Sequence, residues 1–406
     1  MGNKHPQSCR AVSAWANSNF VVTLITIIGC ALLTNSALAD ARDQAKRIHD
    51  RLAGVMPSET VLNDMVNDIN GSGGPQAAAM RAMNNPAFYN VTLKNWATPW
   101  TNRDQTVFAP LNDYTATVIG MVRDDVGFDQ LLSANLVYHA NGVVANSQTA
   151  PNYSPANNAH YEFLEDNGVD LMAELVADTQ TNVSGLPDSA TAGVMTTRAA
   201  AEAFFVAGTN RAMFRFTLLN HMCTDLEQVK DNTRSPDRIR QDVSRSPGGD
   251  SRIFMNNCSG CHTGMDPMAQ AFAYYQFDEA SGQLEYTPGS VQPKYFINGE
   301  TFAPGYVTPD DGWDNYWRTG QNQLLGWDPG LPGSGNGAKT MGEELAGSQA
   351  FAACQVKKAF KLACLRDPVD AADRQKVNDM TAMFTTSGAY RMKPVFAEAA
   401  AYCMGT

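Results

Sequence analysis

The sequence predicts a mainly α-helical, multi-helical protein with a small β or loop insertion. Apolar residues recur every three to four positions through residues 40–136 and 196–223, and again from about residue 340. This is the spacing of one buried face of an α-helix. Between residues 283 and 330 it gives way to short runs separated by Gly, Pro and Asn, a pattern typical of strands and turns. We therefore expect helices on both sides of an irregular insertion.

The first 39 residues predict a secretory signal peptide. An apolar run of 14 residues, Phe20–Leu33, follows a basic start and precedes small residues at Ala37 and Ala39, which is the order that signal peptidase cleaves. The run is shorter than the roughly 20 residues that cross a bilayer. We expect cleavage after Ala39 and a periplasmic protein without a transmembrane span. Alternatively, cleavage before Cys30 would leave an outer-membrane lipoprotein.

The charge of the chain limits its partners. Loss of the signal changes the formal net charge from −11 to −13, because Lys4 and Arg10 leave with it and the signal contains no acidic residue. An acidic chain without a basic tract is not expected to bind nucleic acid. Its surface favours a basic protein partner.

The helices are predicted from apolar spacing and capping residues. Ile48 and Leu52 share one face of the segment ARDQAKRIHDRLAGV, and Ser58 stands as an N-cap before the next helix. Residues 141–160 are rich in Asn, Ser and Pro and predict a long surface loop. Further helices are predicted over residues 75–88, 128–140, 196–223, 340–364, 370–385 and 389–403.

A polar connector over residues 224–250 predicts a domain boundary. We expect an all-helical N-terminal domain over residues 40–225. A second helical domain would cover residues 226–406 and carry the insertion at about residues 283–330.

Six cysteines remain after signal cleavage. In an oxidising compartment, the four outside the C-x-x-C motif described below predict disulfides. Cys354 and Cys364 are ten residues apart in a predicted helix and so lie on different turns. We expect one of them to pair with Cys403 and the other with Cys223; the sequence leaves open which one.

The segment NNCSGCHTGMDP, residues 256–267, carries the chemistry. Cys258 and Cys261 are separated by two residues, and His262 follows directly. C-x-x-C-H is the signature of covalent c-type haem attachment: two thiols bind the vinyl groups and the imidazole binds the iron. We predict one haem c, with His262 as the proximal iron ligand, in a cytochrome c-like haem domain.

Other uses of the motif are less well supported. A zinc site needs a second Cys/His pair with ligand spacing, and the remaining cysteines do not form one. A thioredoxin-like redox pair needs a βαβ context, which the helical pattern does not provide.

The iron ligand opposite His262 decides the function. A methionine or histidine there makes an electron carrier, whereas an open position permits peroxide chemistry. Met392 is the first candidate, because it stands just ahead of Pro394 and a terminal helix, as in small cytochromes c. Met341 is the second, and His221, in an apolar helix, is the third.

The segment CSGCHTGMDPMAQAFAYYQFDEASG, residues 258–282, resembles the haem-binding segment of the planctomycete-type cytochrome domain family. The matching residues are Cys258, Cys261, His262, Asp266, Pro267, Phe277, Asp278 and Gly282. The segment GSQAFAACQVKKAFKLAC, residues 347–364, resembles the C-terminal helical module of that family, with Phe351 and Cys354 in place. The resemblance implies an exported haem protein that transfers electrons.

These observations lead to one main hypothesis and two alternatives. The main hypothesis is an exported monohaem c-type cytochrome that passes single electrons in the periplasm to or from a basic redox partner. The first alternative is a peroxidase-like haem enzyme with an open iron position. The second is a helical binding or scaffold protein in which the haem is accessory.

Overall fold

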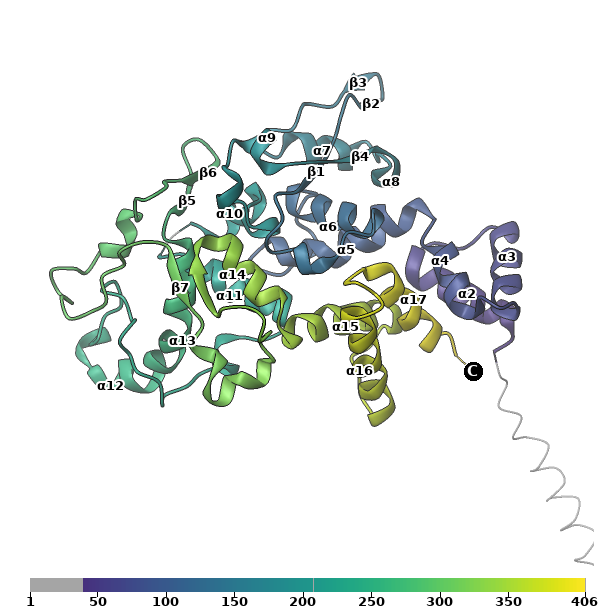
Figure 1. Cartoon of the computed structure of the whole chain (residues 1–406). Coiled ribbons are helices and arrows are strands. Elements are labelled where there is room, and N and C mark those ends of the chain that lie inside the picture. The colour runs from purple at the N-terminus through teal and green to yellow at the C-terminus, as the bar shows by residue number, and fades with distance from the viewer. Residues whose placement is uncertain (1–38, 207, 406) are drawn as a thin grey trace, which may run out of the picture.

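The computed structural model describes residues 39–206 and 208–405, so residues 1–38 of the predicted signal peptide, with Cys30, lie outside the described residues. The described chain is mainly helical, which confirms the predicted class (Figure 1). The α-helices are α2 (Ala41–Ala53), α3 (Glu59–Asn70), α4 (Gly74–Ala82), α5 (Lys94–Ala97), α6 (Asp113–Arg123), α7 (Ala159–Asp166), α8 (Leu171–Glu174), α9 (Gln180–Ser184), α10 (Arg198–Phe204), α11 (Arg211–Thr217), α12 (Ser251–Ile253), α13 (Ser259–Ala269), α14 (Gly337–Ala346), α15 (Gln349–Cys364), α16 (Ala371–Thr385) and α17 (Met392–Tyr402).

Short helices of other types connect these elements. The π-helical turns are η1 (Phe88–Leu93), η6 (Leu218–Met222) and η9 (Phe254–Cys258). The 3-10 turns are η2 (Thr98–Thr101), η3 (Phe128–Gln130), η4 (Asp188–Ala190), η5 (Gly193–Thr196), η7 (Leu226–Gln228), η8 (Pro247–Gly249), η10 (Gln270–Phe272), η11 (Pro293–Phe296), η12 (Tyr316–Arg318) and η13 (Gly320–Leu325).

The first helices begin where their capping residues predict. The Asp40 side chain accepts from the backbone N–H of Asp43 at the start of α2, and Ser58 accepts from that of Val61 at the start of α3. Each cap satisfies an N–H that has no partner inside its helix. The predicted Ser58 cap is therefore confirmed.

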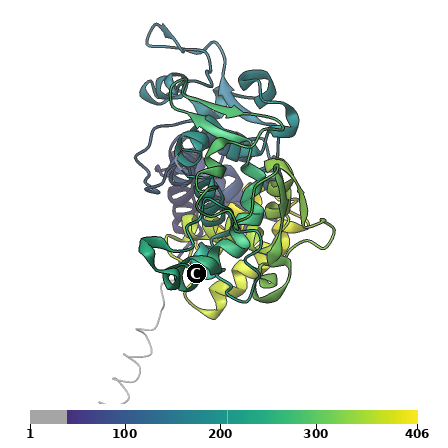
Figure 2. The ribbon, with the colours of Figure 1, turned by 90° about the vertical axis from the view of Figure 1, so that its left-hand side faces the viewer.

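The strands form separate two-stranded antiparallel ribbons. These are β1 (Val137–Ala140) with β4 (Leu175–Asp178), β2 (Val144–Ala145) with β3 (Gln148–Thr149), β5 (Tyr275–Asp278) with β6 (Gln283–Tyr286), and β7 (Gly312–Asp314) with β8 (Ser334–Asn336). The β2–β3 hairpin projects at the top of the molecule in both ribbon views (Figures 1 and 2). The β6 and β7 strands lie in the predicted insertion, but their partners lie outside it.

Two of these ribbons lie within residues 40–225, which the sequence predicts to be all-helical. The predicted helix over residues 128–140 is instead η3 followed by β1, and every side chain of β1 is buried. The ring of Tyr138 in β1 packs directly on Gly120 of α6, where a Cβ would overlap it. A short apolar run fits a buried strand as well as a helix, and this contact selects the strand.

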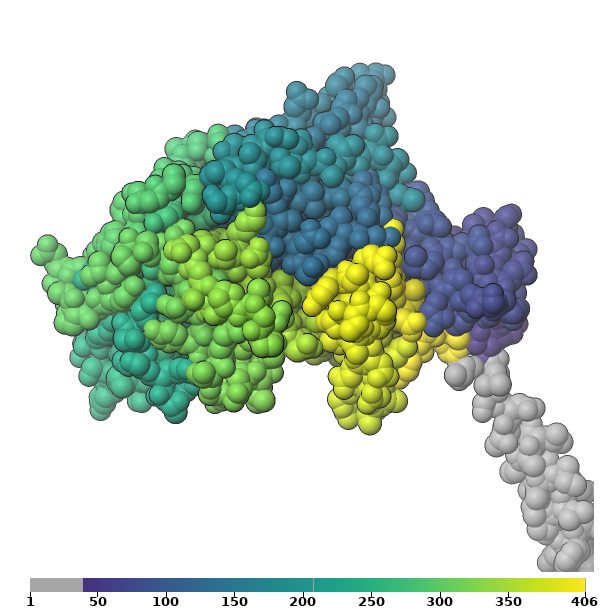
Figure 3. Space-filling model, in the orientation of Figure 1, coloured from purple at the N-terminus to yellow at the C-terminus, as the bar shows by residue number. Residues whose placement is uncertain are grey.

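One hydrophobic core extends across the predicted domain boundary. Its buried residues run from Ala45 in α2 to Ala400 in α17. The last helix, α17, packs on α4, α15, α16 and α2. The first and last segments of the described chain accordingly adjoin on the surface in Figure 3. The boundary near residues 225–250 stays a prediction.

Two disulfides join the four cysteines outside the C-x-x-C motif. Cys223 pairs with Cys354 and Cys364 pairs with Cys403. The expectation that one cysteine of α15 pairs with Cys403 and the other with Cys223 is thus confirmed. The first bridge closes a separation of 131 residues and links η6 to α15, whereas the second closes 39 residues and links α15 to the end of α17.

Loss of either disulfide should lower the free energy of unfolding. The decrease should be larger for the disulfide that closes the longer loop. Chain entropy assigns roughly 5 kcal/mol to the longer loop and roughly 4 kcal/mol to the shorter one, with smaller values common in practice. We expect Cys223→Ser/Cys354→Ser and Cys364→Ser/Cys403→Ser to unfold at lower urea concentrations than the parent. Dithiothreitol, which reduces both bridges, should lower the urea midpoint of the parent to that of the variant in which all four cysteines are replaced by serine. Unchanged urea midpoints would show that the bridges contribute nothing.

Candidate functional site

The C-x-x-C-H motif lies where a short helical approach meets a longer helix. Residues of α12 and η9 lead into the motif, and α13 begins at Ser259. Phe254 is buried and lies under the guanidinium of Arg245, 5.2 Å from the ring centroid. This contact anchors the approach, so that Cys261 and His262 lie in the first turn of α13.

The two thiols of the motif are not joined to each other. Cys258 and Cys261 are both half-buried and free, although the other four described cysteines are paired. Burial, followed by the negative charge of Glu227, raises the pKa of Cys261. A redox-active C-x-x-C pair instead depends on a lowered thiol pKa. The two thiols are therefore exposed enough to be attached to another group. The raised pKa of Cys261 is the opposite of what a disulfide-exchanging pair needs.

His262 is held by one ring nitrogen only. Its Nδ1 lies 3.1 Å from Oδ1 and 3.2 Å from Oδ2 of Asp266, one helical turn later on the same face of α13. A carboxylate can only accept, so Nδ1 carries the proton and donates it. Among the described residues no hydrogen bond reaches Nε2 of His262, and its side chain is 18% exposed. A carboxylate at one nitrogen and an open second nitrogen is how metal-binding histidines are oriented.

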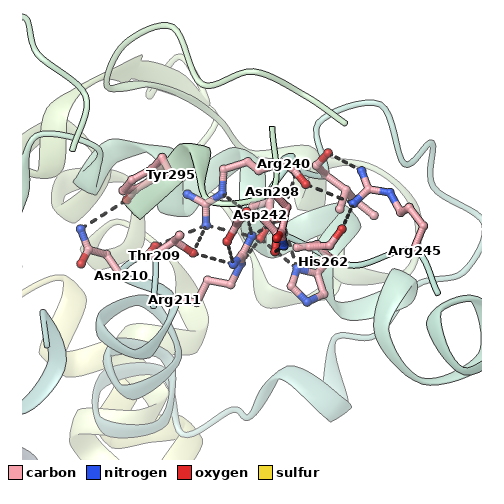
Figure 4. A network of polar contacts seen from close by, with 12 residues as sticks. Thr209, Asn210, Arg211, Arg240, Asp242, Arg245, His262, Tyr295 and Asn298 are labelled. Carbon is pink, nitrogen blue, oxygen red and sulfur yellow. Dashed lines mark hydrogen bonds and ion pairs between the residues drawn. The ribbon is translucent and has the colours of Figure 1, made fainter. Parts of the chain in front are cut away.

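Asp266 is completely buried and is held by two arginines, Arg211 and Arg240. Figure 4 shows both arginines in one polar network with His262. The Arg211 guanidinium donates Nε to Oδ1 at 2.6 Å and Nη2 to Oδ2 at 2.9 Å. Burial by itself would raise the pKa of Asp266, but Arg211, His262 and Arg240 hold it well below its usual range. Arg211 also donates Nη2 to Asp242 at 2.9 Å. This one guanidinium therefore bridges two carboxylates.

The polar connector over residues 224–250 supplies the rest of this network. Arg240 is fully buried, its Nη2 donates to the Thr209 hydroxyl at 3.0 Å, and its guanidinium lies 4.5 Å from the ring centroid of Tyr295. Arg245 donates to backbone carbonyls of the connector itself. This role of the connector was not predicted from the sequence. The signal available in the sequence was RIRQDVSR, residues 238–245, where three arginines surround one aspartate.

The structure does not bring the first predicted distal ligand, Met392, to His262. It is the first residue of α17, is 1% exposed, and lies in the core among helices that belong to the ends of the chain. Figure 1 shows α17 well separated from α13. Met341 is fully buried in α14, which packs mainly against β8, η10 and η3. That placement provides no support for Met341 as a ligand.

His221 is a core histidine. Its Nε2 lies 2.6 Å from the Tyr114 hydroxyl, and its ring stacks between Tyr114 and Phe351. Burial, followed by the positive charge of Lys358, holds the pKa of His221 well below its usual range. Its role in the described structure is packing and one buried hydrogen bond.

The residues of the motif include the groups that would bind a covalently attached haem. It offers two free, half-exposed thiols and one imidazole with an open Nε2, all within five residues. Two apolar side chains in the helical approach to the motif, Ile253 and Met255, are 41% and 60% exposed. Exposed apolar groups of this size next to a reactive motif suit the edge of a flat apolar ligand. The residues fit the group.

Comparison with known protein families, with curated proteins and with solved structures finds no match for the chain. The resemblance to the planctomycete-type cytochrome domain family therefore stays a prediction. Within residues 39–206 and 208–405, no group of three or more His, Cys, Asp or Glu side chains is placed to hold a metal ion, and no helix is long and apolar enough to cross a membrane.

Substitution of Asp266 by asparagine should destabilise the fold strongly. Removal of this carboxylate leaves Arg211 and Arg240 with Asp242 as their one remaining carboxylate among the described residues, and breaking a buried ion pair costs about 3 to 5 kcal/mol. Urea unfolding at pH 7 measures this loss. Asp250→Asn, which removes the partner of the exposed Arg252, is the control and should leave the midpoint close to that of the parent. Equal midpoints for the two variants would contradict a structural role of the network.

The same pair of variants tests the pH dependence. Because the pKa of Asp266 is lowered in the folded state, its contribution is present above the usual aspartate pKa. It is lost as the pH falls below about 4, where the unfolded chain takes up a proton that the folded chain does not. We expect the stability of Asp266→Asn to fall less steeply between pH 4 and pH 2 than that of the parent.

Proposed function

We propose that the chain is an exported monohaem c-type cytochrome that transfers single electrons. Cys258 and Cys261 would hold the haem through thioether bonds, and Nε2 of His262 would bind the iron. The observation that supports this most is the orientation of His262: its Nδ1 donates to Asp266, and no hydrogen bond from the described residues reaches its Nε2. The haem supplies a one-electron couple, and the protein tunes it through ligands and surroundings.

Each neighbouring residue has a separate task in this proposal. Asp266 fixes the tautomer and direction of the His262 ring, and its negative charge makes the imidazole a stronger donor. Arg211 keeps Asp266 ionised and immobile through two hydrogen bonds. The motif, Asp266 and Arg211 would together form part of a cytochrome c-like haem domain, as in the planctomycete-type family that the motif resembles.

The proposed compartment is the periplasm. Disulfides form and persist in oxidising compartments, and both disulfides of the described chain link distant segments. The free thiols of the motif would be occupied there by the haem. The formal net charge of −11 favours a basic redox partner, whose docking should weaken as salt concentration rises.

A second candidate is a haem enzyme that activates peroxide. The observation that favours it is the carboxylate at Nδ1 of His262, because a more basic proximal ligand favours bond-cleaving chemistry over electron transfer alone. An optical spectrum distinguishes the two functions. A low-spin spectrum that peroxide and cyanide leave unchanged supports the electron carrier, and a high-spin ferric spectrum that peroxide changes supports the enzyme.

Haem attachment should depend on the two motif thiols. In a periplasmic expression host that matures c-type cytochromes, we expect the parent to keep haem after denaturing electrophoresis. Cys258→Ala/Cys261→Ala should carry no covalent haem, because no thioether bond can form. Cys223→Ser/Cys354→Ser is the matched control, since it also removes two sulfurs, and it should keep its haem. A parent purified from such a host without covalent haem would contradict the proposal.

The methionines named from the sequence should not determine the spectrum of the iron. We expect Met392→Ala to leave the spin state of the purified haem protein unchanged, because α17 lies apart from α13. Met341→Ala serves as the paired variant in the same optical titration. A change from low spin to high spin in Met392→Ala alone would show that α17 reaches the haem.

A further inference from the structure

A large groove lies among α2, η1, α5, η2 and α15, outside the C-x-x-C-H site. Its volume is about 1180 Å³, which is sufficient for a small organic molecule. The helices that form it lie apart from α13 in Figure 1. None of its lining residues takes part in the network around Asp266.

The floor of the groove is apolar and aromatic. The rings of Trp96 and Trp100 meet edge to face with centroids 4.5 Å apart. Leu362 of α15 and Val91 of η1 line the same groove, and Val91 is 45% exposed. Exposed apolar groups inside a concave site are stabilised when an apolar ligand covers them.

The charged lining is mainly positive, although the chain as a whole is acidic. Five basic residues line the groove against two acidic ones, Asp43 and Asp50, whereas the whole chain has a formal net charge of −11. Lys46 pairs with Asp50, and Lys361 forms an exposed pair with Asp367 at 3.1 Å. Within the described residues Arg47 and Arg51 make no ion pair and donate only to backbone carbonyls of Met404 and Cys403.

A third basic side chain, Lys358, lies at the aromatic floor, where burial holds its pKa well below the usual range and disfavours its charged form. The Lys358 ammonium lies 3.4 Å from the ring centroid of Trp100 and donates to the backbone carbonyl of Asn220 at 2.6 Å. Among the described residues no carboxylate pairs with it. The charge that attracts an anion therefore comes mainly from Arg47 and Arg51, which have no carboxylate partner among the described residues.

We propose that this groove binds an amphipathic carboxylate, with its apolar body against Trp96, Val91 and Leu362 and its head among Arg47, Arg51 and Lys361. The aromatic and aliphatic floor supplies the affinity for the body, and the basic residues select the sign of the head. This is a binding function separate from haem attachment, and it does not depend on the proposed electron transfer.

Dodecanoate is the probe, titrated into the full mature protein by isothermal calorimetry. The expected result is saturable binding of one molecule. Dodecanol and dodecyltrimethylammonium, which have the same chain with a neutral or positive head, should bind at least about tenfold more weakly. No saturable binding of dodecanoate, or equal binding of the three probes, would overturn the proposal.

Two variants locate the site, each with a matched control. Lys361→Gln should weaken dodecanoate binding by about threefold to tenfold. Lys357→Gln, exposed one turn earlier on α15 and outside the groove, should not weaken it. Val91→Glu places a carboxylate in the lining and should weaken binding by more than about tenfold. Val176→Glu, at a 39% exposed position of β4, should bind as the parent does.

These four variants change exposed or half-exposed side chains, so their circular dichroism spectra should match that of the parent. Equal affinities within either matched pair would overturn the location of the site. Haem content is measured in the same samples and should be unchanged in all four. A loss of dodecanoate binding with full haem content would therefore concern the groove alone.

Discussion

The functional region depends on the hydrogen bonds and ion pairs of the buried Asp266 carboxylate. This carboxylate accepts from Arg211 and from Nδ1 of His262, and it lies close to Arg240. Such a charge is tolerated in the interior only when it is paired on several sides. Because the arginines come from α11 and from the connector, the same atoms that orient His262 also join three segments of the chain. Removal of the carboxylate would disturb the ring orientation and the packing together.

In the rest of the molecule, the disulfides and the continuous core hold distant segments of the chain together. Cys364–Cys403 ties α15 to the end of α17, and α17 packs on α2 and α4 near the start of the described chain. Of the C-terminal helices, α15 forms one side of the groove that α2 and η1 also line. The C-x-x-C-H helix and the groove are thus two separate regions supported by one core.

Local features of the site were predictable, and long-range partners were not. The spacing of Cys258, Cys261 and His262, the helical approach, and the split of α15 cysteines between two bridges all follow from residues close in sequence or on one helix. Arg211 lies 55 residues from Asp266, and no local pattern connects them. Met392 looked suitable because of its neighbours in sequence, but helix packing places it in a different part of the core.

The sequence by itself determined the helical class, the capped first helices and the presence of two thiols and an imidazole within five residues, because periodicity, caps and C-x-x-C-H spacing are properties of short segments. Tertiary structure decided that Val137–Ala140 is a strand, because Tyr138 packs on Gly120. It also decided that the 224–250 connector carries buried Arg240, and that basic residues of α2 and α15 line one groove with Trp96 and Trp100. Burial and pairing of charge depend on which distant segments come together, and a single segment does not contain that information.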